Sequence, residues 1–280
     1  MRPTSLAVLG LGAIGASVAW GAKRAGGIRV IGHASHRGDA IRALKADAVD
    51  LLAERPEDAV REAELVVIAE PAGVALRLLG RMAPLLPAGA LVTSAAALMG
   101  PVAQAAEGAG LASRWAASHP VGPRELGGFE AAGPDAMRGA VVYVSGTGAA
   151  SEQAVTEVMD FWGGVLEAHP VRMTAADHDI RLAWLVHLPR VLAGALGAAY
   201  DQRGLSGVRW GHEAQETARP ATDPVDLASA MLADREAMLA ATDAFAAALA
   251  PIRAALAAGD ASTLVQLLTS ARRPGKEGQR

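Results

Sequence analysis

The sequence of 280 residues contains no cysteine, and only 4% of its residues are aromatic. The absence of cysteine excludes disulfide bonds and catalysis by a thiolate, although it does not fix the cellular compartment. Hydrophobic residues nevertheless make up 51% of the chain. Since many of them are alanine, we expect a large core in which helices pack closely through small side chains.

Blocks of like charge and long apolar runs are also lacking. The 26 basic and 29 acidic residues give a net charge of −3, and no basic cluster is typical of a nucleic-acid-binding arm. No apolar stretch approaches the roughly 20 residues that a membrane-spanning helix needs. The apolar N-terminal segment contains several glycines, which argues against a signal peptide. We therefore expect a cytoplasmic protein that binds neither nucleic acid nor membranes.

The first fifteen residues carry the motif around which the chain is organised. Residues 5–9 predict a short buried strand, and residues 16–25 predict a helix. The turn between them has the pattern G-x-G-x-x-G, which in dinucleotide-binding folds lets a pyrophosphate approach the helix N-terminus. A glycine-rich turn in some other α/β domain is the alternative. The predicted cofactor-binding residues of this turn are Gly10, Leu11, Gly12, Ala13, Ile14 and Gly15.

The end of the second predicted strand, residues 28–34, bears on which dinucleotide is favoured. NAD-binding folds commonly place a carboxylate here to bind the ribose hydroxyls, but none occurs before Asp39. Ser35, His36 and Arg37 follow the strand instead. Since all three can donate hydrogen bonds to a 2′-phosphate, we predict a preference for NADP over NAD. An ordinary solvated loop is the alternative for these three residues.

Strands and helices alternate along the first half of the chain. The further predicted strands are 64–69, 90–94 and 114–118, and the predicted helices are 39–50, 72–86 and 100–107. This alternation is typical of a parallel, doubly wound α/β sheet, whose ligands bind beyond the carboxyl ends of the strands. Glu70 and Pro71 lie at such an end and are predicted to contact the cofactor.

His119 follows the predicted strand 114–118 and precedes a glycine-rich loop. Its position favours proton transfer beside a nicotinamide, and the ordinary pKa of histidine suits that task near neutral pH. Taken alone, a histidine at the end of a strand is more often structural than catalytic.

The last hundred residues predict helices almost throughout. Thr174 and Asp177 form a short variant of the capping box at the start of a helix over 175–201. Pro189 is expected to kink that helix because it lacks an N–H group. Another helix is predicted over 224–250, where a proline occupies the first turn.

Two histidines on the predicted helix 175–201 raise the question of a metal. His178 and His187 are nine residues apart, which places them on roughly opposite faces of a regular helix. They are therefore poor partners for a metal ion, and we predict no metal site.

The change from alternating elements to helices alone predicts two domains without a low-complexity linker between them. We expect a Rossmann-type dinucleotide-binding domain over 1–172 and an all-α substrate and dimerisation domain over 173–280.

Six motifs follow one another in a characteristic order and spacing. They are residues 10–17, residues 84–93, His119-Pro120 with Glu125 and Gly128, residues 173–179, His187-Leu188-Pro189 and residues 217–224. In these motifs the chain resembles the prephenate and arogenate dehydrogenase family, which makes tyrosine. The resemblance covers nearly the whole length.

The resemblance implies a Rossmann-type domain, a helical domain that builds a homodimer, and oxidative decarboxylation of a cyclohexadienol. Hydride would pass to a nicotinamide, and His119 would take the proton of the ring hydroxyl. Arg219 would hold a substrate carboxylate, whereas Glu125 and His187 would line the pocket. Arg190, which departs from the family pattern, could bind a second carboxylate or compensate for a missing lysine. Without the resemblance, Arg219 would be interpreted as a surface arginine near a helix start.

The departures from the family pattern concern the expected site. Ala97 and Met99 stand where the resemblance implies a serine and a lysine, and Val186 and Arg190 replace a serine and a second histidine. Three functions therefore stay open. The first is an NADP-preferring prephenate or arogenate dehydrogenase, the second a dehydrogenase for a modified prephenate in a secondary pathway. The third is an NADP(H)-binding protein that has lost turnover.

Overall fold

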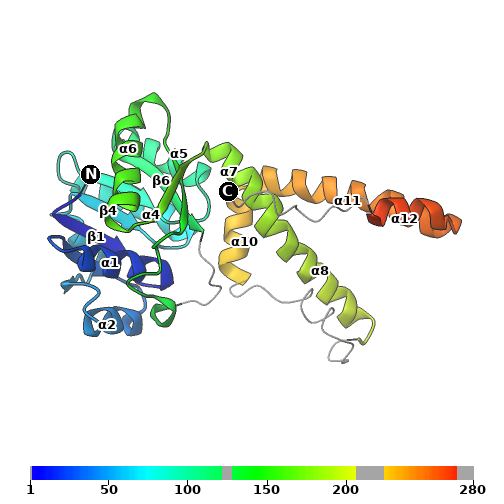
Figure 1. Ribbon diagram of the computed structural model, residues 1–280, viewed down its shortest axis with the longest axis horizontal. Helices are drawn as coiled ribbons and strands as arrows, with labels where there is room; N and C mark the ends of the chain where they lie inside the picture. Colours follow the sequence, from blue (N-terminus) through cyan, green and yellow to red (C-terminus); the bar gives the residue numbers. More distant parts are fainter. Residues whose placement is uncertain (1, 122–127, 206–223, 270–280) are drawn as a thin grey trace. The chain divides into compact units, whose positions relative to one another are not determined.

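The computed structural model describes residues 2–121, 128–205 and 224–269. The chain divides into two compact units, Met1–Arg235 and Glu236–Arg280. The first unit contains one eight-stranded sheet with the strand order β3-β2-β1-β4-β5-β6-β7-β8 (Figure 1). Its strands are β1 (Ser5–Leu9), β2 (Arg29–His33), β3 (Leu51–Leu52), β4 (Leu65–Ile68), β5 (Leu91–Ser94), β6 (Trp115–Val121), β7 (Val141–Ser145) and β8 (His169–Arg172).

Neighbouring strands run parallel throughout the sheet except at one position, where β7 is antiparallel to β6. The predicted α/β class and its mainly parallel sheet are therefore confirmed, whereas β3 and β7 were not predicted. A parallel neighbour requires a crossover connection, which alternating apolar segments and helices reveal in a sequence. The residues of β7 favour a strand, but an antiparallel return has no crossover helix to mark its pairing.

Helices cover both faces of the sheet because alternate residues of each strand point to opposite sides. Leu6 and Val8 of β1 face a core that α1 and α6 complete, whereas Ala7 and Leu9 face a second core beneath α3, α4 and α5. These helices are α1 (Ala13–Ala25), α3 (Pro56–Ala59), α4 (Ala72–Met82), α5 (Gly100–Gly108) and α6 (Glu152–Asp160). At the edge of the first core, α2 (Arg37–Lys45) contributes the fully buried Ala43.

A small polar network lies inside the first core. The Oγ atom of Ser118 lies 2.7 Å from Oγ1 of Thr93 and accepts a hydrogen bond of 3.0 Å from Nε1 of Trp162. All three side chains are fully buried. The network ties β5 and β6 to η5 (Phe161–Val165), the π-helical turn that follows α6.

One long helical segment follows β8 in the first unit. It consists of α7 (Ala175–Leu182), the π-helical turn η6 (Ala183–His187) and α8 (Leu188–Gln202). Thr174 caps it by accepting a hydrogen bond of 3.1 Å from the backbone N–H of Asp177, as predicted. The irregularity expected at Pro189 takes the form of η6, which ends two residues before this proline. A π-helical turn is one way of accommodating a missing backbone hydrogen bond.

The remaining described helices depart from the predicted single helix over 224–250. The first unit ends with α10 (Pro224–Ala233), which packs against α4 and η6, and Asp234 separates it from α11. The second unit contains α12 (Ala261–Thr269) and all but the first residue of α11 (Arg235–Ala258). Pro251 lies inside α11 and does not end it. The position is exposed, so water can bond the carbonyl group that this proline leaves without a donor.

Two helical segments, Ala175–Gln202 and Arg235–Ala258, are long and apolar enough to cross a membrane by length and composition. The expectation that no stretch approaches this length is therefore wrong. Composition cannot distinguish a membrane span from a helix whose apolar face packs against protein. On the first segment Ile180, Trp184 and Leu185 are exposed, the last at 75%.

Candidate active site

The strand register brings the predicted site residues to one edge of the sheet. Leu9 of β1 pairs with Ile68 of β4, which pairs with Ser94 of β5, which pairs with Ala117 of β6. Because these strands are parallel, the residues that follow each of them lie along the carboxyl edge. The glycine turn after β1, Glu70 after β4 and His119 of β6 therefore share that edge.

The glycine turn fits the close approach that a dinucleotide requires. Gly10 has a positive φ of 95°. A Cβ atom on Gly15 would lie 1.8 Å from the carbonyl oxygen of Gly10, so only glycine lets α1 start this close to β1. A Cβ atom on Gly12 would meet nothing within 4 Å. Gly12 is also the N-cap of α1 and makes no side-chain cap, so space and free N–H groups coincide where a pyrophosphate would bind.

Glu70 stands beside this turn and carries a perturbed carboxyl group. Its Cδ atom lies 3.2 Å from the position that a Cβ atom of Gly10 would occupy. Burial raises the pKa of Glu70, and the charge of Asp226 raises it further, whereas His33 opposes the shift. Pro71 is exposed and precedes α4 as its N-cap residue.

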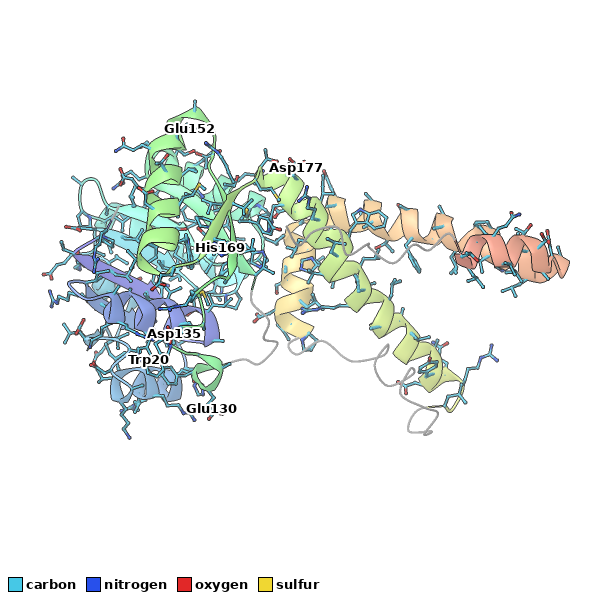
Figure 2. All side chains as sticks on the ribbon, in the orientation of Figure 1. Trp20, Glu130, Asp135, Glu152, His169 and Asp177 are labelled. Atoms are coloured by element: carbon cyan, nitrogen blue, oxygen red, sulfur yellow. The ribbon has the colours of Figure 1, made fainter. Side chains whose placement is uncertain are left out.

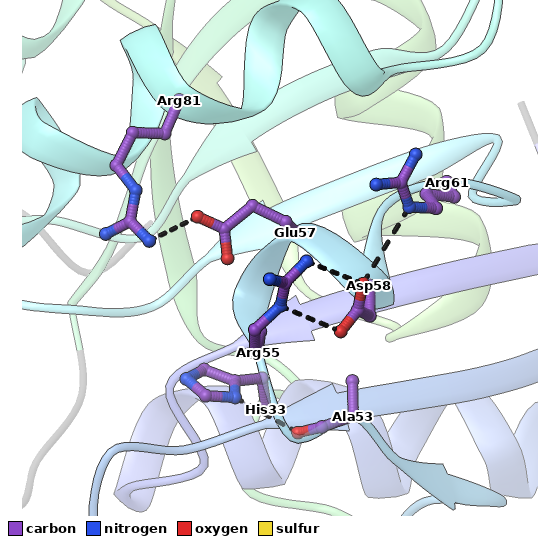
Figure 3. A network of polar contacts seen from close by, with 7 residues as sticks. All are labelled: His33, Ala53, Arg55, Glu57, Asp58, Arg61 and Arg81. Carbon is purple, nitrogen blue, oxygen red and sulfur yellow. Dashed lines mark hydrogen bonds and ion pairs between the residues drawn. The ribbon is translucent and has the colours of Figure 1, made fainter.

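The segment after β2 presents Ser35, His36 and Arg37 to solvent. His36 caps α2 by accepting a hydrogen bond of 3.3 Å from the backbone N–H of Asp39. At the end of β2, Nδ1 of His33 lies 3.1 Å from the carbonyl oxygen of Ala53 (Figure 3). The ion pairs drawn there surround α3: Arg55 and Arg61 pair with Asp58 locally, and Arg81 of α4 pairs with Glu57 of α3.

Asp39, the first carboxylate after β2, is engaged by neighbouring groups. It lies 3.3 Å from Arg42 and 3.4 Å from His36, and it accepts a hydrogen bond of 3.2 Å from the backbone N–H of Phe129. Phe129 stacks on Trp20 with ring centroids 5.9 Å apart. Figure 2 labels Trp20 on α1 together with Glu130, which follows Phe129 in the turn η3 (Phe129–Ala131). The charge of Asp39 is therefore compensated by Arg42 and a backbone donor.

His119 lies inside β6, which continues to Val121, and not in a loop after the strand. Its ring is partly exposed, and its Nδ1 atom lies 2.8 Å from Nε2 of His178. The two rings meet edge to face at 86°. Burial lowers the pKa of His119 to about 4; His178 and His187 lower it as well, and Asp179 raises it. His119 is therefore neutral at physiological pH, as a proton acceptor must be.

His178 is linked in turn to a buried carboxylate. Nδ1 of His178 lies 2.8 Å from Oδ1 of Asp179, and both side chains are buried. Oδ1 of Asp179 accepts a hydrogen bond of 3.0 Å from the backbone N–H of Met99, and Oδ2 accepts one of 2.7 Å from that of Gly100. These two N–H groups belong to the start of α5, where the helix dipole also favours a negative charge. A continuous polar chain thus runs from α5 to His119.

His187 is also buried near His119, although the sequence placed it opposite His178. In a regular helix, residues nine apart are separated by two and a half turns and so lie half a rotation apart, but η6 changes the rotation between them. The prediction of opposite faces is therefore wrong. Burial lowers the pKa of His187, and the nearby Arg190 lowers it further. Nδ1 of His187 is buried and has no hydrogen-bond partner within the described part of the chain.

The structure thus brings most of the predicted site residues to the carboxyl edge of the sheet, whereas two of them are not described. Glu125 and Arg219 lie outside the described residues. Arg190 is exposed, one turn beyond His187. The role of His178 and Asp179 was not predicted from the sequence, although the two adjacent residues stand in a motif that the resemblance had singled out. Over residues 2–121, 128–205 and 224–269, no group of three or more potential ligands could hold a metal ion.

Comparisons with known proteins show the family and the fold of this chain. Residues 18–169 match the family model described as the nucleotide-binding domain of prephenate dehydrogenase. Arogenate dehydrogenase from Synechocystis is 22% identical over 95% of this chain and 96% of its own, with a TM-score of 0.80. Prephenate dehydrogenase from A. aeolicus, in complex with hydroxyphenyl propionate and NAD+, is 20% identical over 95% of each chain, with a TM-score of 0.87. The curated proteins include no match.

Proposed function

The chain belongs to the prephenate dehydrogenase family, and we propose that it oxidatively decarboxylates a cyclohexadienol, prephenate or arogenate, with transfer of hydride to NADP. The observation that carries this proposal is a neutral, oriented histidine at the same sheet edge as the glycine turn. An NAD+ complex of a structurally similar prephenate dehydrogenase supports it.

In the proposed reaction His119 accepts the proton of the ring hydroxyl through its Nε2 atom, because Nδ1 is bonded to His178. The hydride would leave the ring carbon that bears this hydroxyl, whose C–O bond becomes a carbonyl, and bound NADP would supply the hydride acceptor. The bond between the ring and its carboxylate then breaks, carbon dioxide leaves, and the electron pair of that bond makes the ring aromatic. His119 finally returns its proton to the phenolate oxygen, so the step consumes no net acid or base.

The substrate carboxylates require cationic groups or hydrogen-bond donors, and we assign this role to residues of the site predicted from the sequence. Arg219 would bind one carboxylate through its planar guanidinium group, with Glu125 lining the pocket. Arg190 would take the second carboxylate, beside the unpartnered Nδ1 atom of His187. Arogenate differs from prephenate by an amino group away from the reacting carbon, so either substrate satisfies this assignment.

The preference for NADP rests on the segment after β2. Ser35 and Arg37 are exposed there, and the carboxylate of Asp39 is engaged by Arg42 and by the backbone N–H of Phe129. A carboxylate that is already paired repels a 2′-phosphate less than a free one. Arg37 can bind the phosphate with two parallel N–H groups.

Met99 and Ala97 favour a second candidate, a dehydrogenase of the same fold for a modified prephenate in a secondary pathway. The Met99 side chain is fully buried, at the position where the resemblance implies a lysine. Since a buried apolar site cannot accommodate an unpaired ammonium group, a lysine side chain could occupy it only after rearrangement. If the third candidate is correct and the protein binds NADP(H) without turnover, His119 has no substrate hydroxyl from which to accept a proton.

We also propose that the protein is a cytoplasmic homodimer whose helical residues 173–280 form the substrate and dimerisation domain, after a cofactor domain over 1–172. Ile180, Trp184 and Leu185 leave an exposed apolar surface on the helical segment after β8, which a second copy would cover. The variant Leu185→Arg is expected to sediment as a monomer. A wild-type protein that sediments as a monomer would contradict the dimer.

The proposed function is tested by following cofactor reduction with prephenate or arogenate and with NADP or NAD, in all four combinations. Turnover that is fastest with NADP and is abolished by His119→Asn is expected. The binding constant for NADPH should be nearly unchanged in this variant, because His119 contacts the substrate. A folded protein that binds NADPH but is inactive in all four mixtures would contradict the proposal. Turnover with an amino-substituted prephenate alone would favour the second candidate.

A further inference from the structure

His178 and Asp179 form a hydrogen-bonded chain behind His119 that reaches the first turn of α5. The chain runs from Nδ1 of His119 to Nε2 of His178 (2.8 Å), and from Nδ1 of His178 to Oδ1 of Asp179 (2.8 Å). We propose that His178 and Asp179 are positioning residues, which fix the tautomer of His119 so that its Nε2 atom faces the substrate as a proton acceptor. The inference rests on the proposed function for its kinetic part only.

The hydrogen-bonding capacity of each group determines the direction of the chain. Both oxygens of Asp179 already accept hydrogen bonds from the backbone N–H groups of Met99 and Gly100. A carboxylate can only accept, so Nδ1 of His178 must be the donor toward Asp179. A neutral imidazole that donates through Nδ1 accepts through Nε2. Nδ1 of His119 therefore donates to His178, and Nε2 of His119 retains its lone pair.

The anchor of the chain is rigid because it belongs to a helix start. Asp179 bridges α7 to α5 through two backbone donors, and a Cβ atom on Gly100 would lie only 3.0 Å from Oδ2 of Asp179. The carboxylate consequently cannot rotate without losing both bonds. Tyr143 lies on the sheet side of these hydrogen-bonded residues. It pairs with His119 across β6 and β7, and its ring centroid lies 5.7 Å from that of His178.

The same arrangement affects the proton affinity of His119. The titratable groups that face it are His178 and Asp179 from α7, His187 from η6 and Tyr143 from β7. Asp179 is the negative charge among them, and it raises the pKa of His119 against the effect of burial. Removal of this charge would make His119 a weaker base. Orientation and basicity would thus both depend on a residue that touches neither substrate nor cofactor.

Three substitutions separate orientation from mere structural support. His178→Gln keeps an acceptor for Nδ1–H of His119, whereas His178→Leu removes it. Asp179→Asn keeps the shape but places an NH2 group either against the backbone N–H of Gly100, or against both the backbone N–H of Met99 and Nδ1 of His178. In the latter case the tautomer of both histidines would be reversed. The matched control is Asp177→Asn, which removes an exposed carboxylate from the same helix.

The first readout is the ¹⁵N spectrum of the imidazole groups at pH 7 without substrate, with His119 assigned by its absence in His119→Asn. The wild-type protein and Asp177→Asn are expected to show a protonated Nδ1 and an unprotonated Nε2 on His119. His178→Leu is expected to show a mixture of tautomers. A wild-type His119 protonated at Nε2, or a spectrum that His178→Leu leaves unchanged, would overturn the inference whatever the substrate is.

The second readout is the pH dependence of turnover. His178→Leu and Asp179→Asn should lower kcat on the order of a hundredfold, with little change in KM, whereas His178→Gln should recover part of the loss. The acid limb of the kcat/KM profile should move to lower pH in Asp179→Asn. Equal losses in kcat for His178→Gln and His178→Leu, with no movement of the limb, would assign the chain a structural role. Absence of wild-type turnover would contradict only the proposed function, because the imidazole spectrum still decides the inference.

Discussion

The first helix lies so close to the first strand that an added methyl group at Gly15 should lower the free energy of unfolding strongly. An alanine Cβ at this position would lie 1.8 Å from the carbonyl oxygen of Gly10 and 2.8 Å from the Cβ atom of Ala69. Neither atom belongs to a flexible side chain that could rotate away. The start of α1 must therefore move by more than 1 Å to restore ordinary van der Waals contact.

The cost of that movement follows from the packing of α1. Ala16 and Ala19 are fully buried against the sheet, so displacement of the helix separates surfaces that are now in contact. Overpacking of this kind costs about 1–3 kcal/mol or more, and a glycine-to-alanine change inside a helix returns about 1 kcal/mol at most. We expect Gly15→Ala to lower the free energy of unfolding by about 2 kcal/mol. For a chain of this size, that corresponds to a fall in Tm of roughly 4–8 °C.

The matched control is Gly12→Ala, three residues earlier in the same turn. A Cβ atom there meets nothing within 4 Å, so thermal unfolding should show a Tm close to that of the wild type. The methyl group would however stand over the free N-terminus of α1 and should weaken NADPH binding about tenfold, measured by fluorescence titration. A Gly15→Ala variant with unchanged Tm would refute the close packing. Undiminished NADPH affinity in Gly12→Ala would refute the pyrophosphate position.

Three further predictions follow from single contacts. Ser118→Ala leaves Nε1–H of the buried Trp162 without its acceptor, and should lower the free energy of unfolding in urea by about 1–3 kcal/mol. Burial holds the pKa of His119 at about 4 in the folded protein. Between pH 6.5 and 4 the unfolded chain therefore binds more protons than the folded protein, so the free energy of unfolding falls as the pH decreases through this window. His119→Asn should abolish up to roughly 3 kcal/mol of that loss, and equal pH dependence in both proteins would count against a buried neutral His119. Arg37→Ala should raise KM for NADP about tenfold and leave KM for NAD within about twofold, and equal effects on both would return Arg37 to the role of a solvated residue.

The glycine turn and the parallel strands could be predicted because their signals are local. The spacing of Gly10, Gly12 and Gly15 between an apolar strand and a helix defines the turn without reference to any distant residue. The capping box of Thr174 is equally local and was predicted correctly. The strand β7 was missed although its residues, Val-Val-Tyr-Val-Ser, favour a strand. Its antiparallel pairing with β6 is not marked by a crossover helix, so the sequence does not reveal it.

The sequence by itself determined the fold class, the edge of the sheet where a dinucleotide would bind and the histidine beside it. These follow from hydrophobic period, glycine spacing and the direction of parallel strands, all of which are properties of short segments. Only the tertiary structure decided the surroundings of His119. His178 lies 59 residues away and contacts it at 2.8 Å, Asp179 reaches the start of α5 across 80 residues, and a π-helical turn brings His187 to the same side. Contacts between distant segments depend on how helices pack on the sheet, and no pattern along the chain encodes that packing directly.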